Sequence, residues 1–168
     1  MKANETKVDK FLATNETTFA IPVYQRNYDW TLFQCKQLLH DIIETGKNDK
    51  TNAHFIGSIV YVHDDVYTAS GLTELTIIDG QQRLTTITLI YIALYRLAKE
   101  LDNQMLVNRI QKTYLINEFA PEEEKLKLKP TENNKEALRH ILNSTDGEEF
   151  KGYSKIIENF DYFKSAIN

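Results

Sequence analysis

The sequence predicts an α+β domain, in which a small mixed β-sheet packs on a buried central helix and a helical extension follows. The first observation is a β-branched and apolar run at 74–78, which is typical of a buried strand. The second is the stretch 81–100, whose apolar residues cover nearly every face, so the helix it predicts is buried rather than amphipathic. The third is the remainder, 101–168, where most apolar residues recur at helical spacing.

The chain length of 168 residues fits one domain. Hydrophobic residues make up 42% of the chain and charged residues 26%, which is enough apolar material for a packed core. We divide the domain into a sheet-containing core at 1–100 and a helical extension at 101–168. The last predicted helix reaches Asn168 without a clear stop signal, so we expect the chain to be the front part of a longer protein.

Local signals in the first half place its elements before the central helix. Pro22 lies within an apolar run and restricts that strand to a sheet edge or a strand start. Thr31 and Gln34 have the spacing of a capping box, which opens the next helix. The run at 54–62 is apolar enough for a central strand. The elements predicted here are a helix near 8–12, a strand at 19–23, a helix at 31–46 and a strand at 54–62.

From residue 64 onward the same reasoning predicts a loop at 64–73, which joins the strands on either side as a wide hairpin. Beyond the central helix, Lys125, Lys127 and Lys129 alternate with leucines, as the solvated face of a half-buried strand does. The other predicted elements are helices at 104–116, after 130–131 and around 156–163, with a loop at 121–124.

Composition excludes several classes of protein. The net charge of −4 argues against a domain that grips nucleic acid by bulk charge, although it leaves room for a local basic groove. Cys35 is the only cysteine, so the chain forms no internal disulfide and no Cys₂His₂ zinc site, and we expect it in the helical core. The N-terminus lacks a signal peptide and no apolar run reaches the ~18 residues of a membrane span. We therefore expect a cytoplasmic protein with no membrane partner.

The strongest functional signal is the turn Asp79-Gly80-Gln81-Gln82-Arg83 between the buried strand and the central helix. A helix that opens directly on a glycine turn leaves backbone N–H groups without intrahelical partners, and these groups favour an anion such as phosphate. The alternative is purely structural: Asp79 would be an N-cap and Gln82 would complete a capping box.

A second polar tract, Tyr24-Gln25-Arg26, follows the strand at 19–23. If this strand runs parallel to the one at 74–78, both polar tracts emerge at the same rim of the sheet, where ligands bind in open sheets. Arg26 and Arg83 would then clamp a phosphate, for which the planar guanidinium is well suited.

The other side chains at this rim suggest further roles. Asp79 is placed to bind a Mg²⁺ ion that bridges phosphate oxygens, or to orient an attacking water. Gln81 and Gln82 are candidates for positioning that water. Tyr24, Tyr28 and Trp30 offer flat faces on which a nucleobase can stack, although large aromatics of this kind are more often part of the core.

Three motifs together resemble the N-terminal domain of GmrSD-type restriction endonucleases. They are Ile21-Pro22-x-Tyr24-Gln25-Arg26-x-Tyr28-x-Trp30, then His54-Phe55-Ile56-Gly57-Ser58, then Ile78-Asp79-Gly80-Gln81-Gln82-Arg83-Leu84-Thr85-Thr86. The resemblance implies a ParB/sulfiredoxin-like fold. Sulfiredoxins carry a catalytic cysteine at the corresponding turn, whereas this chain has glutamines, so sulfinic-acid reductase chemistry is excluded.

The resemblance also implies a function: binding and probable hydrolysis of a nucleoside triphosphate (NTP) with Mg²⁺, within a system that restricts foreign and often modified DNA. An HNH-type nuclease domain in the same or a partner chain would cut the DNA, so we expect no nuclease activity from this fragment. The predicted catalytic residues are Asp79, Gln81, Gln82 and Arg83, with Asp79 as the metal ligand. The predicted nucleotide-binding residues are Tyr24, Gln25, Arg26, Gly57, Ser58, Gly80 and Thr85, and Tyr28 and Trp30 are candidate base contacts.

A second function stays open at this point. The Tyr24-Gln25-Arg26 tract could instead belong to a non-catalytic module that recognises DNA or a protein partner. Duplex binding that ignores NTP but requires Arg26 would favour this second function, whereas NTP-dependent stabilisation would favour the first.

Overall fold

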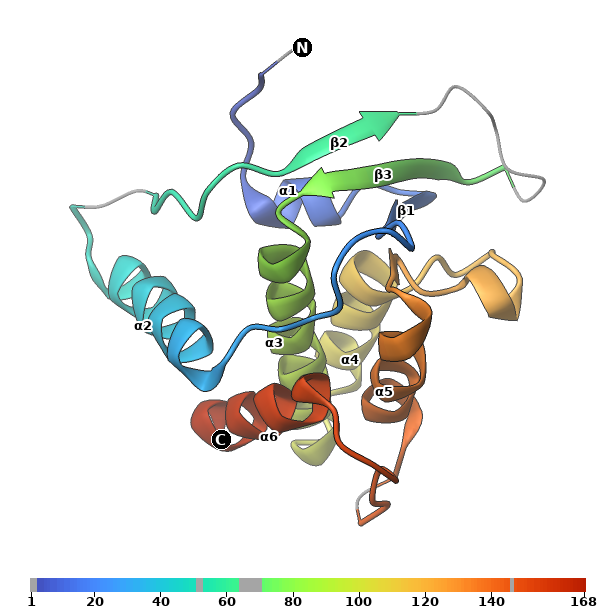
Figure 1. Cartoon of the computed structure of the whole chain (residues 1–168). Helices are drawn as coiled ribbons and strands as arrows, with labels where there is room; N and C mark the ends of the chain where they lie inside the picture. The colour runs from blue at the N-terminus through green and yellow to red at the C-terminus, as the bar shows by residue number, and fades with distance from the viewer. Residues whose placement is uncertain (1–2, 51–52, 64–70, 146) are drawn as a thin grey trace.

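The computed structural model describes residues 3–50, 53–63, 71–145 and 147–168 (Figure 1). Within these ranges it confirms the predicted α+β class, because a mixed sheet lies above a long central helix and further helices surround that helix. The strands are β1 (Thr17–Ala20), β2 (Val60–His63), β3 (Thr73–Asp79) and β4 (Leu128–Lys129). The helices are α1 (Val8–Leu12), α2 (Leu32–Lys47), α3 (Gln81–Glu100), α4 (Gln104–Ile110), η1 (Gln111–Leu115), η2 (Glu122–Glu124), α5 (Glu132–Asn143) and α6 (Lys155–Ile167).

The described strands form one sheet in the order β2-β3-β1-β4. β1 runs parallel to β3, with Phe19 beside Leu75, and parallel to β4. β2 pairs antiparallel with β3, as the predicted hairpin requires. The predicted hairpin loop at 64–73 falls largely outside the described residues.

Two strand predictions were wrong in position. The run at 54–62 was expected to be a central strand, but only its end belongs to β2, which is an exposed edge strand. The strand at 19–23 was expected to lie at a sheet edge or to start at Pro22, yet β1 spans Thr17–Ala20 and is an interior strand. Pro22 is tolerated because the strand ends before it. The last donation to the β4 side comes from the Ile21 N–H, which bonds the Lys129 carbonyl at 2.9 Å.

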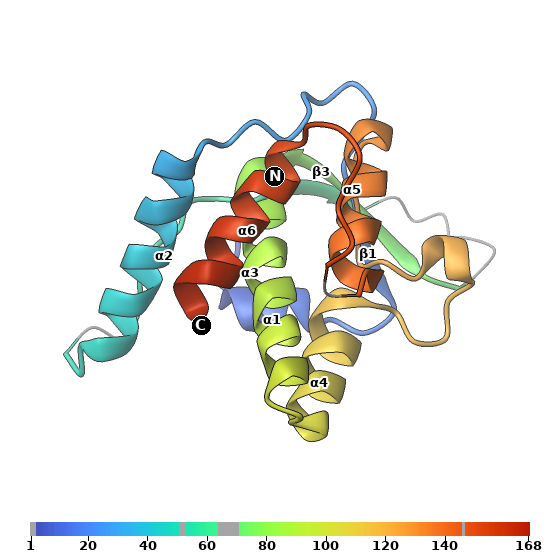
Figure 2. The same cartoon turned by 90° about the horizontal axis from the view of Figure 1, so that it is seen from below.

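The central helix α3 is buried on nearly all sides, as its sequence predicts. Leu84 and Leu89, which lie on different faces of the helix, are both fully buried. α3 packs against α4, η1 and α6, and Figure 2 shows it in the middle of the helical layer. One hydrophobic cluster extends from Leu12 to Phe163, so the core and the helical extension share their interior. Across the described ranges no helix combines the length and apolar character needed to cross a bilayer.

The predicted capping box of α2 is confirmed. Thr31 is the N-cap residue, its hydroxyl faces the backbone of the first turn, and the Gln34 side chain accepts from the Thr31 N–H at 2.8 Å. The same helix buries Cys35 completely, in agreement with the expected core position.

The prediction for Lys127 was wrong, because this side chain is buried rather than solvated. Its ammonium group donates to three main-chain carbonyls, those of Leu12 at 3.1 Å, Thr14 at 2.9 Å and Thr113 at 2.7 Å. Alternation does not decide which face of a short strand meets water. Here a helical segment and the N-terminal segment cover the face that the sequence assigned to solvent, and their free carbonyls satisfy the ammonium.

Burial lowers the pKa of Lys127 to about 8, well below its ordinary value of 10.5. Between these two pH values the unfolded chain holds a proton that the folded chain has lost, so the free energy of unfolding increases with pH through this residue. We expect the stability of the wild type, relative to Lys127→Met, to rise by about 2 kcal/mol between pH 7.5 and 9.5.

Urea denaturation at several pH values measures this difference, and subtraction of the variant removes the titration of other groups. Lys125→Met is the control, at a half-exposed lysine of the same segment whose ammonium pairs with Glu122. A constant difference between wild type and Lys127→Met across the range would contradict the assignment.

Candidate functional site

The polar turn lies where β3 ends and α3 begins. Asp79 is the last residue of β3, Gly80 adopts the left-handed conformation with φ +93°, and Gln81 starts the helix. A Cβ atom at Gly80 would lie 3.0 Å from the carbonyl oxygen of Ser58. The glycine is therefore required twice, by its backbone conformation and by the close approach of the segment before β2.

The structural alternative for this turn, helix capping by Asp79, is wrong. Gly80 is the N-cap residue of α3, and no side chain in the described part of the chain caps the helix. Asp79 belongs to β3, where it pairs with Val60, and Gln82 turns its side chain away from the N-cap. The first turn of α3 is thus left without a side-chain acceptor for its N–H groups.

The two polar tracts meet at one rim of the sheet, as expected from the parallel pairing of β1 and β3. Gln25 makes the connection: its side-chain Nε2 donates to the carbonyl of Ile78 at 3.0 Å, and its Oε1 accepts from Gln81 Nε2 at 3.1 Å. The Tyr24-Gln25-Arg26 tract is thereby held against the start of α3.

Gln82 fixes the chain that follows this tract. Its Oε1 accepts from the N–H groups of Asp29 at 2.8 Å and Trp30 at 3.2 Å, and its Nε2 donates to the carbonyl of Asn27 at 3.0 Å. Both ends of the buried amide are occupied. In this conformation Gln82 positions the backbone of residues 27–30 rather than a water molecule.

Arg83 lies on the other flank of the turn. Its Nη2 donates to the carbonyl of Ser58 and lies 3.8 Å from the Asp79 carboxylate, and its side chain packs against Gly57, whose φ is +103°. The Arg83 Nε is buried and has no hydrogen-bond partner among the described residues. Within the described ranges the guanidinium is therefore anchored to the protein by the hydrogen bond of Nη2.

The two arginines approach the turn from different sides. The sheet order places β2 and β1 on opposite sides of β3, so the Gly57-Ser58 segment and the Arg26 tract flank the turn. Arg26 is exposed. The hydrogen bond and charge of Lys155 are the main causes that lower the pKa of the Asp29 carboxyl, and the charge of Arg26 adds a smaller contribution. A shared clamp of Arg26 and Arg83 on one anion stays a prediction.

The aromatic residues divide between core and surface. Tyr28 is buried, and its hydroxyl hydrogen-bonds Thr86 at 2.8 Å, which favours the core alternative over base stacking. Trp30 is half-buried against the core, and Thr85 is buried in the second turn of α3. Tyr24, with 72% of its surface exposed, is the ring of the three that is open to a ligand.

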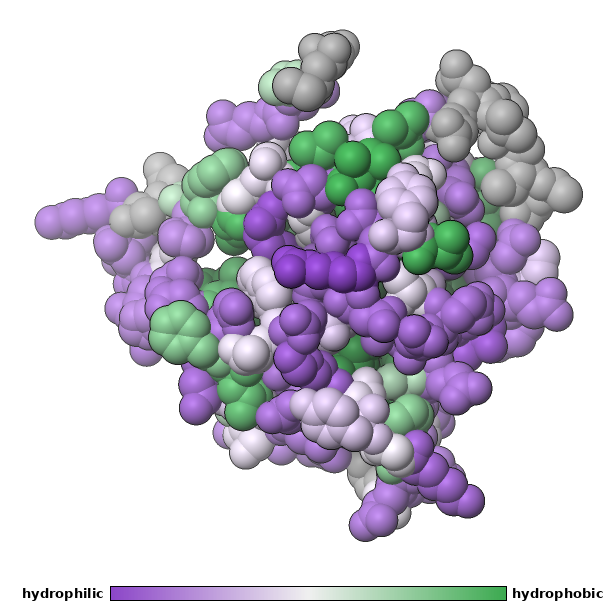
Figure 3. All heavy atoms as spheres, in the orientation of Figure 1, coloured by the Kyte–Doolittle hydropathy of each residue, from purple (hydrophilic) through white to green (hydrophobic). Residues whose placement is uncertain are grey.

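Figure 3 shows the face of the molecule on which the chain after β1 crosses in front of α3. Hydrophilic side chains cover this crossing, and apolar ones gather above it over the sheet. Exposed apolar residues of the sheet layer include Val60, Val62 and Ile78. The site is thus a polar surface bordered by an apolar one.

Sequence reasoning missed two contributors to this site. Asn27 supplies a carbonyl to Gln82 and a side-chain Oδ1 to the hydroxyl of Thr131 at 3.0 Å. Asn159 of α6 reaches the same segment from the far end of the chain. A signal for Asn159 existed, since a polar residue stands on the apolar face of a helix between Ile156 and Phe163.

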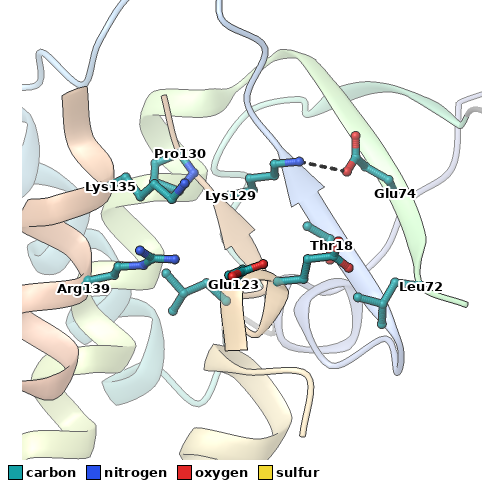
Figure 4. Close-up of a pocket in the computed structure, with 10 residues that line it drawn as sticks. Thr18, Leu72, Glu74, Glu123, Lys129, Pro130, Lys135 and Arg139 are labelled. Atoms are coloured by element: carbon teal, nitrogen blue, oxygen red, sulfur yellow. Dashed lines mark ion pairs between the residues drawn. The ribbon is translucent and has the colours of Figure 1, made fainter. Parts of the chain in front are cut away.

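A hollow lies away from this turn, beside β4 and α5 (Figure 4). Two of its cations are paired with carboxylates: Lys129 lies 3.5 Å from Glu74, and Lys135 lies 3.3 Å from Glu132. It contains none of the predicted site residues. Among the described residues no group of three histidine, cysteine, aspartate or glutamate side chains is arranged to hold a metal by itself.

The fold and site together define a small α+β domain whose polar strand-to-helix turn lies at the rim of a mixed sheet. The family model described as "GmrSD restriction endonuclease, N-terminal domain" matches residues 8–167. The chain belongs to this family, as its three motifs had suggested, and membership supports a role in restriction, that is, in defence. The comparison with curated proteins found no match.

The space at Gly80 can be tested by substitution. Gly80→Ala combines the strain of a positive φ with a contact on the Ser58 carbonyl, and we expect it to cost about 2–3 kcal/mol of unfolding free energy. Gly147→Ala is the matched control, because Gly147 has φ +96° and open space around it, so only the φ strain of about 1 kcal/mol applies. If denaturant unfolding gives equal losses of unfolding free energy for the two variants, the turn can accommodate a Cβ at Gly80 without a steric clash.

Proposed function

We propose that this domain binds a nucleoside triphosphate with Mg²⁺ at the turn Asp79–Arg83 and hydrolyses it. The observation that carries the proposal is the uncapped first turn of α3, which is flanked by the guanidinium of Arg83. Unpaired N–H groups and the helix dipole favour phosphate at such an end. The neighbouring arginine supplies a positive charge that would offset the negative charge developing around the γ-phosphate in the transition state.

Arg83 is suited to this role because only part of its guanidinium group is bonded to described residues of the protein. The Ser58 carbonyl holds one nitrogen of the guanidinium, while the pair with Asp79 is long and the Asp79 carboxylate is largely exposed, so the pair contributes little. A phosphate can replace Asp79 as the partner of Arg83 at small cost. The Nε of Arg83 is buried and lacks a partner among the described residues, so it becomes a further donor when the side chain shifts toward a phosphate.

The residues present fit a nucleotide-bound Mg²⁺ rather than a metal held by the protein alone. Asp79 offers an exposed carboxylate at the turn, and Mg²⁺ in nucleotide sites is commonly held by one or two carboxylates together with phosphates and waters. Asp79 would be the protein ligand. The ion would neutralise charge on the phosphate oxygens.

The glutamines then have distinct tasks in the proposal. Gln82 fixes the backbone of residues 27–30, and Gln81 is held by Gln25, from which it can turn toward an attacking water. Thr85, Gly57 and Ser58 shape the walls of the site, and Tyr24 offers an exposed ring to the base. In a restriction system, hydrolysis here would license an HNH-type nuclease domain, in the same or a partner chain, on DNA that includes modified DNA.

Nucleotide-dependent heat stabilisation tests the proposal. With ATP, GTP, CTP or UTP and Mg²⁺ at about 100 times Kd, we expect at least one to raise Tm by about 5 °C or more. Arg83→Ala should abolish the shift by removing the phosphate partner, and Asp79→Ala should abolish its dependence on Mg²⁺. The control is Arg139→Ala, which replaces an exposed arginine at the hollow beside α5 and should keep the nucleotide-dependent rise in Tm. A wild type that responds to no NTP would refute the proposal.

A recognition role is the second candidate, and the exposure of Tyr24 beside the exposed Arg26 favours it. If this tract reads DNA, duplex binding should be independent of NTP and should fall about tenfold in Arg26→Ala, with a lower salt dependence, because one phosphate contact is lost. Fluorescence anisotropy across salt concentrations measures both. Arg109→Ala, at a surface arginine of α4, is the control, and equal effects of the two variants would speak against the tract.

A further inference from the structure

A chain of buried hydrogen bonds leads from α6 to the candidate site. Asn159, which is fully buried, donates from Nδ2 to the hydroxyl oxygen of Tyr28 at 3.0 Å. The Tyr28 hydroxyl is 2.8 Å from Thr86 Oγ1, and Thr86 in turn donates to the carbonyl of Gln82 at 2.8 Å. Four residues from three segments are thereby connected in series.

The direction of every bond in this series is determined by the number of protons. Thr86 donates its hydroxyl proton to the Gln82 carbonyl, so the bond between Tyr28 and Thr86 uses the Tyr28 proton. The Cys35 Sγ lies 3.6 Å from the same Tyr28 hydroxyl, and its S–H is then the donor of that weaker contact. Burial raises the pKa of Tyr28 well above its ordinary value, so the hydroxyl keeps this proton. The Tyr28 oxygen is then free to accept from Asn159. All donors point from α6 toward Gln82, an arrangement in which successive bonds strengthen one another.

Asn159 also holds the site segment directly. The same Nδ2 donates to the carbonyl of Trp30 at 2.8 Å, and one turn earlier Lys155 donates to the carbonyl of Asp29 at 3.2 Å. The N–H groups of the same two residues, Asp29 and Trp30, donate to the Gln82 Oε1. The segment at 28–30 is thus held from α3 on one side and from α6 on the other.

We propose that Asn159 is a positioning residue of the candidate site, which sets the place of Gln82 and of residues 28–30 from α6. This inference rests on the proposed function for its catalytic consequence, but the coupling itself is independent of any nucleotide. A displacement of α6 therefore alters the site, and an occupied site restrains α6.

The chain offers a matched control in Asn117. It is also buried, its Nδ2 donates to the Thr17 carbonyl at 3.0 Å and to the Thr18 hydroxyl at 3.3 Å, and its Oδ1 has no partner in the described ranges, as in Asn159. Asn117 supports the start of β1, whereas Asn159 supports residues beyond its end. Asn117→Leu and Asn159→Leu hence remove the same chemistry from two places.

Amide hydrogen exchange of the nucleotide-free chain tests the coupling, with the Leu89 amide as the reference for global unfolding. Relative to this reference, Asn159→Leu should speed exchange of the Asp29 and Trp30 amides about tenfold or more, and Asn117→Leu should leave them unchanged. Tyr28→Phe keeps the ring but breaks the series, so it should act in the same direction. Unchanged Asp29 and Trp30 amides in Asn159→Leu and Tyr28→Phe, or equal effects of the two asparagine variants, would overturn the proposal.

Steady-state hydrolysis of the NTP that stabilises the wild type tests the catalytic consequence. Asn159→Leu and Tyr28→Phe should each lower kcat about tenfold or more with little change in KM, and the double variant should lose no more than Asn159→Leu alone, because the Tyr28 link is already broken in that variant. Asn117→Leu should retain the wild-type kcat. Equal kcat in Asn159→Leu and Asn117→Leu would overturn the positioning role. A wild type that hydrolyses no NTP would instead reject the proposed function, and the exchange experiment would still decide the coupling.

Discussion

The candidate site depends on the parallel pairing of β1 with β3. Parallel neighbours end at the same rim of a sheet, so two polar tracts separated by about fifty residues are delivered to one place. Gln25 then bonds both the end of β3 and the start of α3. Because β2 occupies the other side of β3, the Gly57-Ser58 segment closes the second flank and orients Arg83.

Buried polar side chains hold this arrangement by bonding to backbone groups. Gln82 bonds the backbone of 27–30, Lys127 bonds three carbonyls, and Asn159 bonds the carbonyl of Trp30. A buried polar group is costly unless it is paired, so each of these contacts permits few alternative positions of the chain. Loops have little apolar surface of their own. The fold fixes their backbone positions through amide and ammonium groups that lie in the core.

The residues of the family's motifs divide between the surface and the interior of the domain. The chain belongs to the N-terminal domain family of GmrSD restriction endonucleases, and several of its motif residues form the polar turn or bond to the segments beside it. Arg83 and Asp79 remain accessible, while Tyr28 and Gln82 are buried and engaged. The motif thus combines accessible charged groups with buried groups that hold the turn and its neighbours, and α6 contributes to the second set through Asn159.

The sequence alone determined the class of the fold, the buried central helix and the capping box of α2, whereas the meeting of the two polar tracts was predicted only for parallel strands, and the tertiary structure supplied that pairing. The first three features follow from periodicity and from residues near one another in the chain. The tertiary structure decided that β1 is interior, that Lys127 is buried, and that Gln82 binds the backbone of 27–30 instead of capping its helix. The reason is physical: each of these depends on partners distant in sequence, and local patterns carry no information about which carbonyls the fold will bring within reach.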